Sequence, residues 1–180
     1  MYNRSHPRVL VMMGSDSDLP VMTNCLNTLD QFSLEYDVIV CSAHRTPDQC
    51  AALAREAADR GISVIIAAAG GAAHLAGVIA AHTILPVIAV PMASTPLAGF
   101  DSLLSMVQMP PGIPVATVAV GEFGATNAAI LAAQIIALGD PFMKLRLLQQ
   151  KSDMATKVQE KNAKLAASLL HKQQGCQATP

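Results

Sequence analysis

Five short apolar segments alternate with five helical segments over the first 140 residues of this chain. The apolar segments span residues 8–13, 34–40, 63–69, 86–90 and 115–120, and the helical segments span residues 19–32, 47–61, 75–81, 101–108 and 124–138. Strands joined by helical crossovers form a parallel sheet with helices on both faces. The alternation therefore predicts an α/β fold, a three-layer sandwich around a five-stranded parallel sheet.

The composition changes after Asp140-Pro141 to Lys, Gln, Leu and Met with helical spacing. This pattern predicts a long C-terminal helix over residues 141–172, which packs on the domain or on a neighbouring subunit. We expect residues 173–180 to form a disordered tail. Residues 1–140 then form one flavodoxin-like domain, which is long enough for a full hydrophobic core.

Charged side chains are few and unevenly distributed. They make up 14% of the chain, and no Lys or Arg lies between Arg60 and Lys144. The acidic residues of that stretch before Asp140 are only Asp101 and Glu122. A sheet buried on both faces accounts for part of this deficit. We expect additional burial in a homo-oligomer larger than a dimer.

The composition disfavours several classes of protein. The net charge is −1, aromatic residues make up 3% of the chain and Trp is absent, so we expect no nucleic-acid binding. Gly and Pro residues interrupt the apolar stretch 62–93, which leaves pieces too short for a membrane span. Residues 1–7 are polar and lack the pattern of an export signal, so we expect a cytoplasmic location.

Four cysteines are present, at Cys25, Cys41, Cys50 and Cys176. They form no CxxC pair and do not cluster with His at the spacing of metal ligands, so we expect structural thiols and no bound metal. Cys41 directly precedes a polar loop and is a possible nucleophile, but no base is evident beside it.

Polar loops follow the first two apolar segments, at residues 14–18 and 42–47. The carboxyl ends of parallel strands open onto one crevice, so we expect both loops to face one ligand. Asp16 and Asp18 would repel a phosphate but accept hydrogen bonds from ribose hydroxyls. The alternative for Asp18 is capping of the next helix. Ser15 and Ser17 are either ligand contacts or ordinary turn residues.

The second loop carries one imidazole and one guanidinium. Arg45 is the only basic side chain expected near the strand ends, and its fork matches the oxygens of a phosphate; the alternative is a solvated loop arginine. His44 is suited to pass a proton to or from a substrate carbon or carboxylate. These groups together suit a small phosphorylated sugar derivative that undergoes proton transfer.

The third loop begins with Gly70 and Gly71, which let the backbone approach a ligand closely. His74 follows, and it either lines the resulting slot or caps the next helix. We expect His82 on a helix surface or in an interface.

Six motifs in a fixed order carry a family resemblance. They are MGSDSD at 13–18, SAHRTP at 42–47, AGGAAHL at 69–75, DSLLSMVQMP at 101–110, GIPVAT at 112–117 and NAA at 127–129. Over about residues 8–148 the chain strongly resembles the N5-carboxyaminoimidazole ribonucleotide mutases of purine biosynthesis, the catalytic subunit of phosphoribosylaminoimidazole carboxylase.

The resemblance implies an isomerase of IMP biosynthesis that transfers a carboxylate from N5 to C4 of aminoimidazole ribonucleotide without metal or cofactor. It implies that Ser15, Asp18 and Arg45 bind the ribonucleotide and that His44 is the general acid and base. We expect further substrate contacts from small and polar residues of the three loops: Ser17, Ser42, Ala43, Gly70, Gly71 and His74. The resemblance also implies a homo-octamer, functionally linked to an ATP-dependent carboxyaminoimidazole ribonucleotide synthetase.

Two related activities stay open at this point: direct carboxylation of aminoimidazole ribonucleotide with carbon dioxide, and a catalytically silent nucleotide-binding subunit. The loop from Gly70 to His74 resembles that of the mutases. Ala76, His82 and Pro111 replace the proline, the lysine, and the arginine or glycine that are usual in the family, which bears on substrate affinity more than on reaction type.

Two other protein classes with this fold fit the sequence less well. A flavin electron carrier needs aromatic residues beside its ring, and the carboxylates Asp16 and Asp18 oppose its phosphate. A phosphoacceptor receiver domain needs an Asp after the third strand and a Lys after the fifth, where this chain has Ala69-Gly70 and Gly121-Glu122.

Overall fold

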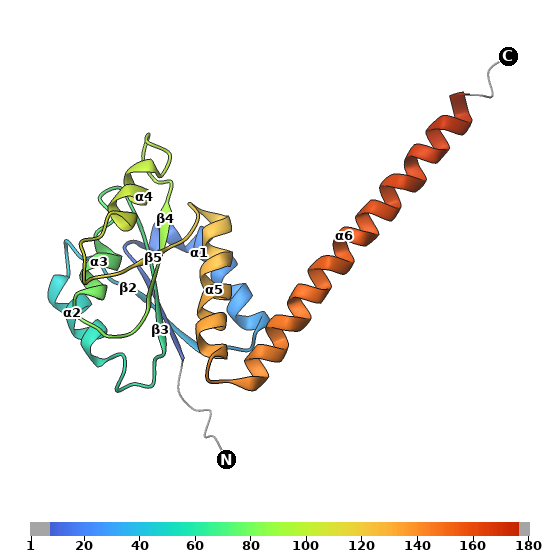
Figure 1. Ribbon diagram of the computed structural model, residues 1–180. Helices are drawn as coiled ribbons and strands as arrows, with labels where there is room; N and C mark the ends of the chain where they lie inside the picture. Colours follow the sequence, from blue (N-terminus) through green and yellow to red (C-terminus); the bar gives the residue numbers. More distant parts are fainter. Residues whose placement is uncertain (1–7, 177–180) are drawn as a thin grey trace.

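In a computed structural model of the protein, which describes residues 8–176, five parallel strands form one sheet in the order β2-β1-β3-β4-β5. The strands are β1 (Val9–Met13), β2 (Tyr36–Val40), β3 (Val64–Gly70), β4 (Val87–Met92) and β5 (Ala116–Thr117). Helices cover both faces of the sheet, which gives three layers (Figure 1). This strand order is that of flavodoxin-like folds, and it confirms the predicted fold class.

The helices alternate with the strands as predicted. They are η1 (Asp16–Asp18), α1 (Leu19–Gln31), α2 (Pro47–Glu56), α3 (Leu75–Ala80), α4 (Phe100–Val107), α5 (Glu122–Ala137) and α6 (Pro141–Cys176). Helices α1 and α5 cover one face of the sheet, and α2, α3 and α4 cover the other (Figure 1).

The central strands are apolar throughout because both of their faces are buried. In β1, Val9, Val11 and Met13 pack in the core under α1 and α5, whereas Leu10 and Met12 pack in the core under α2 and α3. Successive side chains of a strand point to opposite faces, so one short segment contributes to two cores. This burial fixes the strand ends, where the loops of the candidate site begin.

Two predicted elements end early. The helix expected over residues 47–61 ends at Glu56, because the chain turns over the next five residues and reaches Gly61 at a φ of +83°. The strand expected over 115–120 is only Ala116–Thr117, which pairs with Ile88 and Ala89 at the edge of the sheet. An edge strand has a single neighbour, so nothing on its outer side extends the ladder.

Two predicted caps are in the expected places but do not cap through their side chains. Asp18 precedes α1 and Thr46 precedes α2, and neither side chain makes a capping hydrogen bond. The Asp18 side chain is buried, and the Oγ1 of Thr46 bonds to the backbone of Ser42 instead. The capping alternative for Asp18 is therefore wrong.

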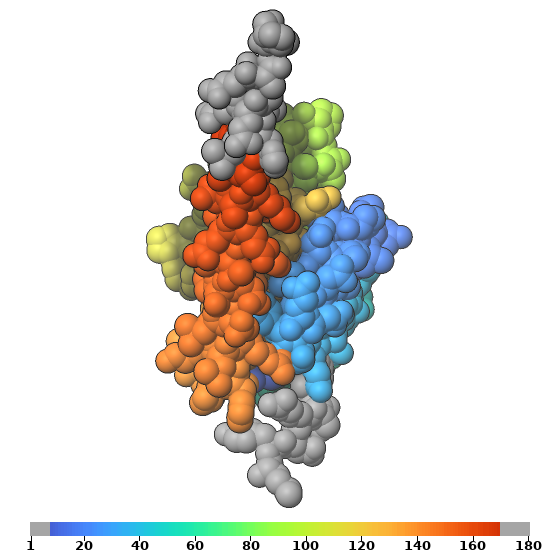
Figure 2. Space-filling model, turned by 90° about the vertical axis from the view of Figure 1, so that its right-hand side faces the viewer, coloured from blue at the N-terminus to red at the C-terminus, as the bar shows by residue number. Residues whose placement is uncertain are grey.

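Helix α6 confirms the predicted long C-terminal helix and continues to Cys176, beyond its expected end. Its first turns pack on the domain, where Met143 is buried and Leu147 contacts the core. The rest of the helix projects from the domain (Figure 1), and in Figure 2 it lies across the near side of the molecule. The tail expected to be disordered over residues 173–180 is helical at 173–176, so that prediction is wrong there, and residues 177–180 lie outside the described residues. No helix among those described is long and apolar enough to span a membrane.

Candidate active site

The carboxyl ends of β1, β2, β3 and β4 open onto a cavity of about 350 Å³. This volume is within the range of small-molecule sites. Its walls come from the four loops that follow these strands, with the following residues: Gly14, Ser15, Ser17, Asp18, Ser42, Ala43, His44, Arg45, Ala69, Gly70, Ala72, His74, Leu75 and Ser94. The two polar loops predicted to face one ligand do meet in one cavity.

Every residue predicted to contact substrate lines this cavity except Asp16 and Gly71. Gly71 lies in the turn next to it, with a φ of +60°. Ser94, after β4, is the polar lining residue that sequence reasoning missed, although the rule that singled out the ends of β1, β2 and β3 applies equally to β4.

Ser15 organises the first loop. Its Oγ accepts hydrogen bonds from the backbone N–H of Ser17 at 3.3 Å and from the Ser17 hydroxyl at 2.8 Å. Its own hydroxyl donates to the Asp16 carboxylate at 3.2 Å. The loop hydroxyls therefore hold one another in place at the mouth of the cavity and present a preorganised polar surface.

Asp18 is a buried carboxyl group in the wall of the cavity, with 6% of its surface exposed. Burial raises the pKa of Asp18, and the neighbouring charge of Asp16 raises it further, while a backbone hydrogen bond from Ser15 lowers it in part. A carboxylate that has lost its water gains from hydroxyl donors, so Asp18 is suited to accept from the hydroxyls of a sugar.

Arg45 is the single Lys or Arg among the lining residues that the structure describes. Its Nη2 donates to the carbonyl oxygen of Gly14 at 3.1 Å, and its backbone N–H donates to the Oγ of Ser42 at 3.3 Å. Arg45 thereby joins the loops after β1 and β2, and the rest of its guanidinium supplies donors for an anion in the cavity.

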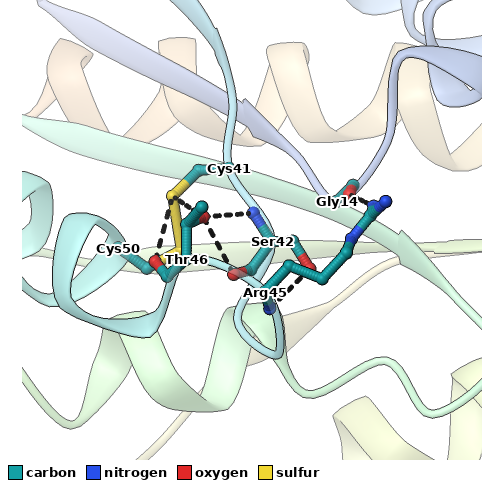
Figure 3. The surroundings of a disulfide bond; sticks show 6 residues. All are labelled: Gly14, Cys41, Ser42, Arg45, Thr46 and Cys50. Carbon is teal, nitrogen blue, oxygen red and sulfur yellow. Dashed lines mark hydrogen bonds between the residues drawn. A yellow bond between two sulfur atoms is a disulfide. The ribbon is translucent and has the colours of Figure 1, made fainter.

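Cys41 and Cys50 form a disulfide at the base of the second loop (Figure 3). The expectation of free thiols is wrong for this pair. Cys41 follows β2 and Cys50 lies in the first turn of α2, and the chain reverses between them so that their Cα atoms are 6.0 Å apart, a normal disulfide separation. Cys25 is a free thiol, and burial raises its pKa to about 12.

His44 and His74 meet across the cavity. The Nε2 of His44 lies 2.8 Å from the Nδ1 of His74, and the ring centroids are 4.9 Å apart in an edge-to-face arrangement. His74 precedes α3 but does not cap it, so of the two predicted roles the lining role is correct. Two imidazoles in contact at the cavity wall can hold and transfer a proton.

Gly70 has no room for a side chain. A Cβ at this position would lie 1.8 Å from the Oγ of Ser94 and 2.9 Å from its Cβ. The loop that carries Ser94 is anchored on either side, because Thr95 donates to Asp101 at 2.7 Å and Ser102 donates to the Met92 carbonyl at 2.9 Å. The absence of a side chain on Gly70 therefore lets a polar hydroxyl enter the wall of the cavity.

Metal chemistry needs a cluster of suitable ligands. Within residues 8–176, no group of three or more His, Cys, Asp or Glu side chains is placed to hold a metal ion.

The chain matches the family model described as AIR carboxylase over residues 8–157. It is 53% identical over 159 residues to a Pyrococcus horikoshii protein named N5-carboxyaminoimidazole ribonucleotide mutase, which covers 88% of this chain and 89% of the relative. It is also 58% identical over 137 residues to the phosphoribosylaminoimidazole carboxylase of Ogataea methanolica, which covers 76% of this chain and 25% of that longer protein.

The fold matches that of a solved relative. The crystal structure of Treponema denticola PurE superposes with a TM-score of 0.79 at 32% sequence identity, over 88% of this chain and 98% of that one.

Proposed function

This chain belongs to the AIR carboxylase family, and we propose that it is an N5-carboxyaminoimidazole ribonucleotide mutase of purine biosynthesis. In this function it converts N5-carboxyaminoimidazole ribonucleotide to 4-carboxy-5-aminoimidazole ribonucleotide. The observation that carries the proposal is the meeting of Arg45, Asp18 and His44 in one cavity at the strand ends. One arginine for a phosphate, one carboxylate for ribose and one imidazole for the ring match the parts of this substrate.

The loops after β1 and β2 bind the ribose phosphate. Arg45 donates to the phosphate oxygens, with the hydroxyl of Ser42 beside it. The hydroxyls of Ser15 and Ser17 donate to Asp16 and Ser15 in the free protein and turn toward the phosphate when it binds. Asp18 accepts hydrogen bonds from the ribose hydroxyls. The phosphate does not lie at Asp18, because a buried carboxylate would repel it. The backbone and small side chains of Ala43 and Gly70, together with His74, border the imidazole ring, and Gly71 lies in the turn next to them.

His44 is the general acid and base. It protonates N5, and the C–N bond to the carboxylate carbon breaks, which releases carbon dioxide. C4 of the ring then attacks this carbon, and His44 removes the C4 proton. The proton gained at N5 equals the proton lost from C4, so the reaction needs no net proton, oxidant or cofactor. Retention of the carbon dioxide beside C4 favours its capture by the ring over its escape to solvent.

Incubation of the purified protein with N5-carboxyaminoimidazole ribonucleotide tests the proposal. We expect the C4-carboxylated product to form without ATP and without added bicarbonate. Because the substrate decomposes to aminoimidazole ribonucleotide, the assay must outpace the uncatalysed loss. If ligand binding is measured but no product forms with any substrate, the chain is a silent binding subunit.

Direct carboxylation is the second candidate, since one of the relatives is named phosphoribosylaminoimidazole carboxylase. A matched incubation with aminoimidazole ribonucleotide and bicarbonate separates the two activities. Product from this pair alone, and none from the N5-carboxy compound, would identify a carboxylase.

The proposed assembly is a homo-oligomer, an octamer, whose contacts between copies bury apolar side chains that are exposed in a single copy. Large exposed apolar side chains lie on α4, on α5 and in the connecting segments: Ile84, Leu97, Phe100, Val107, Phe123 and Leu138. The apolar residues Met154, Val158, Leu165 and Leu169 of α6 are also exposed.

The charge of α6 indicates where this helix packs. Residues 141–176 contain seven of the twelve Lys and Arg residues but only two of the thirteen Asp and Glu. A basic helix complements the acidic remainder of the chain, so α6 packs on the domain of a neighbouring copy. Light scattering tests this assembly, and a monomer at micromolar concentration would contradict it. The cytoplasmic location and the link to an ATP-dependent synthetase stay predictions.

A further inference from the structure

The Cys41–Cys50 disulfide closes the loop that carries His44 and Arg45 (Figure 3). The two cysteines are nine residues apart in sequence and are buried, with 1% and 0% of their surfaces exposed. The loop residues 44–49 between them are exposed. Exposed loops with few buried contacts open more easily than the core. The cross-link is therefore the main covalent restraint on the position of this loop.

A chain of polar contacts leads from the disulfide to Arg45. The Sγ of Cys41 lies 3.5 Å from the Oγ1 of Thr46. That Oγ1 accepts from the backbone N–H of Ser42 and donates to the Ser42 carbonyl, both at 3.1 Å. The Oγ of Ser42 in turn accepts from the backbone N–H of Arg45 at 3.3 Å, as Figure 3 shows. Movement of Cys41 therefore shifts the residues that hold Arg45.

Reduction changes the hydrogen bonds available at the first of these contacts. In the disulfide the Sγ of Cys41 carries no hydrogen and acts only as an acceptor. In the thiol it becomes a weak donor, with the backbone carbonyl of Thr46 3.9 Å away and the Thr46 hydroxyl closer. Reduction thus removes the covalent link to α2 and also alters how Thr46 is held.

We propose that Cys41 and Cys50 are positioning residues, and that their disulfide is a reversible modification site that sets how tightly the cavity holds the phosphate-bearing end of its ligand. This inference rests on the proposed function, because it takes Arg45 as the phosphate contact. The oxidised form is the tight-binding one, since the cross-link holds Arg45 in place before the ligand arrives. In a reducing compartment such a disulfide forms transiently, which suits a regulatory role.

The chemistry is thiol–disulfide exchange with a dithiol. A thiolate of the dithiol attacks one sulfur of the pair, and the Cys41–Cys50 bond breaks as a mixed disulfide forms. The second thiol of the reagent then attacks, and the reagent leaves as its own disulfide. Two electrons pass to the protein, and each cysteine takes up one proton. Because both sulfurs are buried, exchange occurs when the loop opens.

The test compares the enzyme after oxidation by glutathione disulfide and after reduction by dithiothreitol. We expect reduction to raise KM for the ribonucleotide about fivefold or more, the usual lower bound of a coupled site, and to change kcat much less. Reoxidation should restore the original KM. Equal KM values in the two states, with the state of the cysteines verified by mass spectrometry, would overturn the proposal.

Two variants provide matched controls. Cys50→Ala should have the high KM of the reduced enzyme and should no longer respond to dithiothreitol. Cys25→Ala removes the buried free thiol of α1, on the other face of the sheet, and should respond like the unmodified protein. A response that persists in Cys50→Ala, or that is lost in Cys25→Ala, would contradict the assignment. If Cys50→Ala does not fold, the comparison of the two redox states of the natural chain decides.

The thermodynamic linkage between ligand binding and disulfide formation supplies an independent measurement. If the disulfide tightens ligand binding by a given factor, bound ligand must favour the disulfide over the dithiol by the same factor. Saturating aminoimidazole ribonucleotide should therefore shift the redox equilibrium of the pair in a dithiothreitol buffer toward the disulfide. An unchanged equilibrium, despite measured binding, would overturn the proposal.

Hydrogen exchange separates this inference from the proposed function. Backbone amides of residues 42–46 should exchange faster after reduction, while those of β3 should not change. If neither redox state turns over or binds the ribonucleotide, the proposed function fails. In that case hydrogen exchange still tests the positioning role of the disulfide, and equal hydrogen-exchange rates of residues 42–46 in the two redox states would overturn it.

Discussion

The Nε2 of His44 and the Nδ1 of His74 lie 2.8 Å apart, and the planes of the two rings meet at 80°. One nitrogen must donate and the other accept, so the contact requires that exactly one of these two nitrogens carry a proton. The residues come from the loops after β2 and β3, which are separated in the sheet by β1. The contact occupies Nε2 of His44, and among the described residues no hydrogen bond engages its other ring nitrogen, Nδ1.

Replacement of His44 tests its assigned role in proton transfer. We expect His44→Asn to abolish turnover, because asparagine keeps a polar side chain but does not exchange a proton near neutral pH. Ligand affinity should change by less than about tenfold, or about 1.4 kcal/mol. Steady-state kinetics and calorimetric binding measure the two effects. Retention of more than a few per cent of activity would contradict the assignment.

Two variants of His74 test whether this residue orients the ring of His44. In His74→Asn the amide keeps a hydrogen-bonding partner near His44, whereas His74→Leu removes it. If His74 orients the His44 ring, the leucine variant should lose more kcat than the asparagine variant, with similar KM values. Equal losses in the two variants would show that His74 acts only through its volume.

The fold was predictable because each central strand is buried on both faces. An unbroken apolar segment such as Val64–Gly70 predicts a strand buried on both faces. Helical connections between such strands require parallel pairing. The end of β5 was not predictable. Residues 115–120 have the composition of a strand, but only Ala116 and Thr117 find partners on β4. Strand length at a sheet edge depends on the register of its neighbour, which the local sequence does not contain.

Arg45 is the proposed phosphate contact. Arg45→Lys should raise KM markedly, because lysine supplies a point charge in place of a bidentate fork, and Arg45→Leu should raise it further. Because proton transfer is assigned to His44, kcat should fall less than kcat/KM in the lysine variant. Steady-state kinetics with the ribonucleotide measure both parameters.

The dephosphorylated nucleoside is the control for this prediction. Its affinity should be low for the unmodified protein and should change little in Arg45→Lys. If the substitution weakens binding of the nucleoside as much as that of the nucleotide, Arg45 does not contact the phosphate, and the proposed orientation of the ligand is wrong.

The candidate site was predictable to the extent that its residues follow strand ends. His44, Arg45 and Asp18 lie in such loops, and the parallel sheet brings these loops together. Ser94 escaped notice because its immediate neighbours Ala93 and Thr95 are neither charged nor glycine, and the next such residues, Gly99 and Asp101, stand at the start of α4. The Cys41–Cys50 pair escaped notice because its spacing is no known motif, and the pairing depends on how α2 turns back under the loop.

The contact between Gly70 and Ser94 predicts a specific pair of substitutions. Gly70→Ala should destabilise the protein by about 1–3 kcal/mol, a typical cost of overpacking, since its Cβ would lie 1.8 Å from the Ser94 Oγ. Adding Ser94→Gly should recover most of this stability. Activity should stay low in the double variant if the Ser94 hydroxyl contacts substrate.

Gly14→Ala is the matched control within the same cavity. A Cβ at Gly14 would lie 3.5 Å from the Ala69 Cβ, an ordinary contact, so denaturant unfolding should show little change in stability. If the double variant Gly70→Ala/Ser94→Gly is as unstable as Gly70→Ala alone, the Ser94 side chain is not what clashes with the added Cβ.

Asp140 joins the domain to α6. Its Oδ1 accepts from the backbone N–H groups of Phe142 at 3.0 Å and Met143 at 3.1 Å, and its Oδ2 pairs with Arg8 at 3.0 Å. The hydrogen bond from Met143 contributes most to holding the pKa of Asp140 below its ordinary value of 3.8, and Phe142 and Arg8 contribute to it further. The charged carboxylate therefore stabilises the start of the helix.

Asp140→Ala should lower the free energy of unfolding by about 1 kcal/mol, the usual value of a lost helix cap. Asp140→Asn keeps the acceptor for Phe142 and Met143 and should lose less. Because the folded pKa is lowered, this stabilisation is present above the unfolded pKa of 3.8 and is lost as the pH falls through the folded value. Denaturant unfolding across pH should therefore show a constant gap between the natural chain and Asp140→Ala above about pH 5, and a shrinking gap below about pH 3.5. A gap that stays constant down to about pH 2 would show that the carboxylate does not stabilise α6 through its charge.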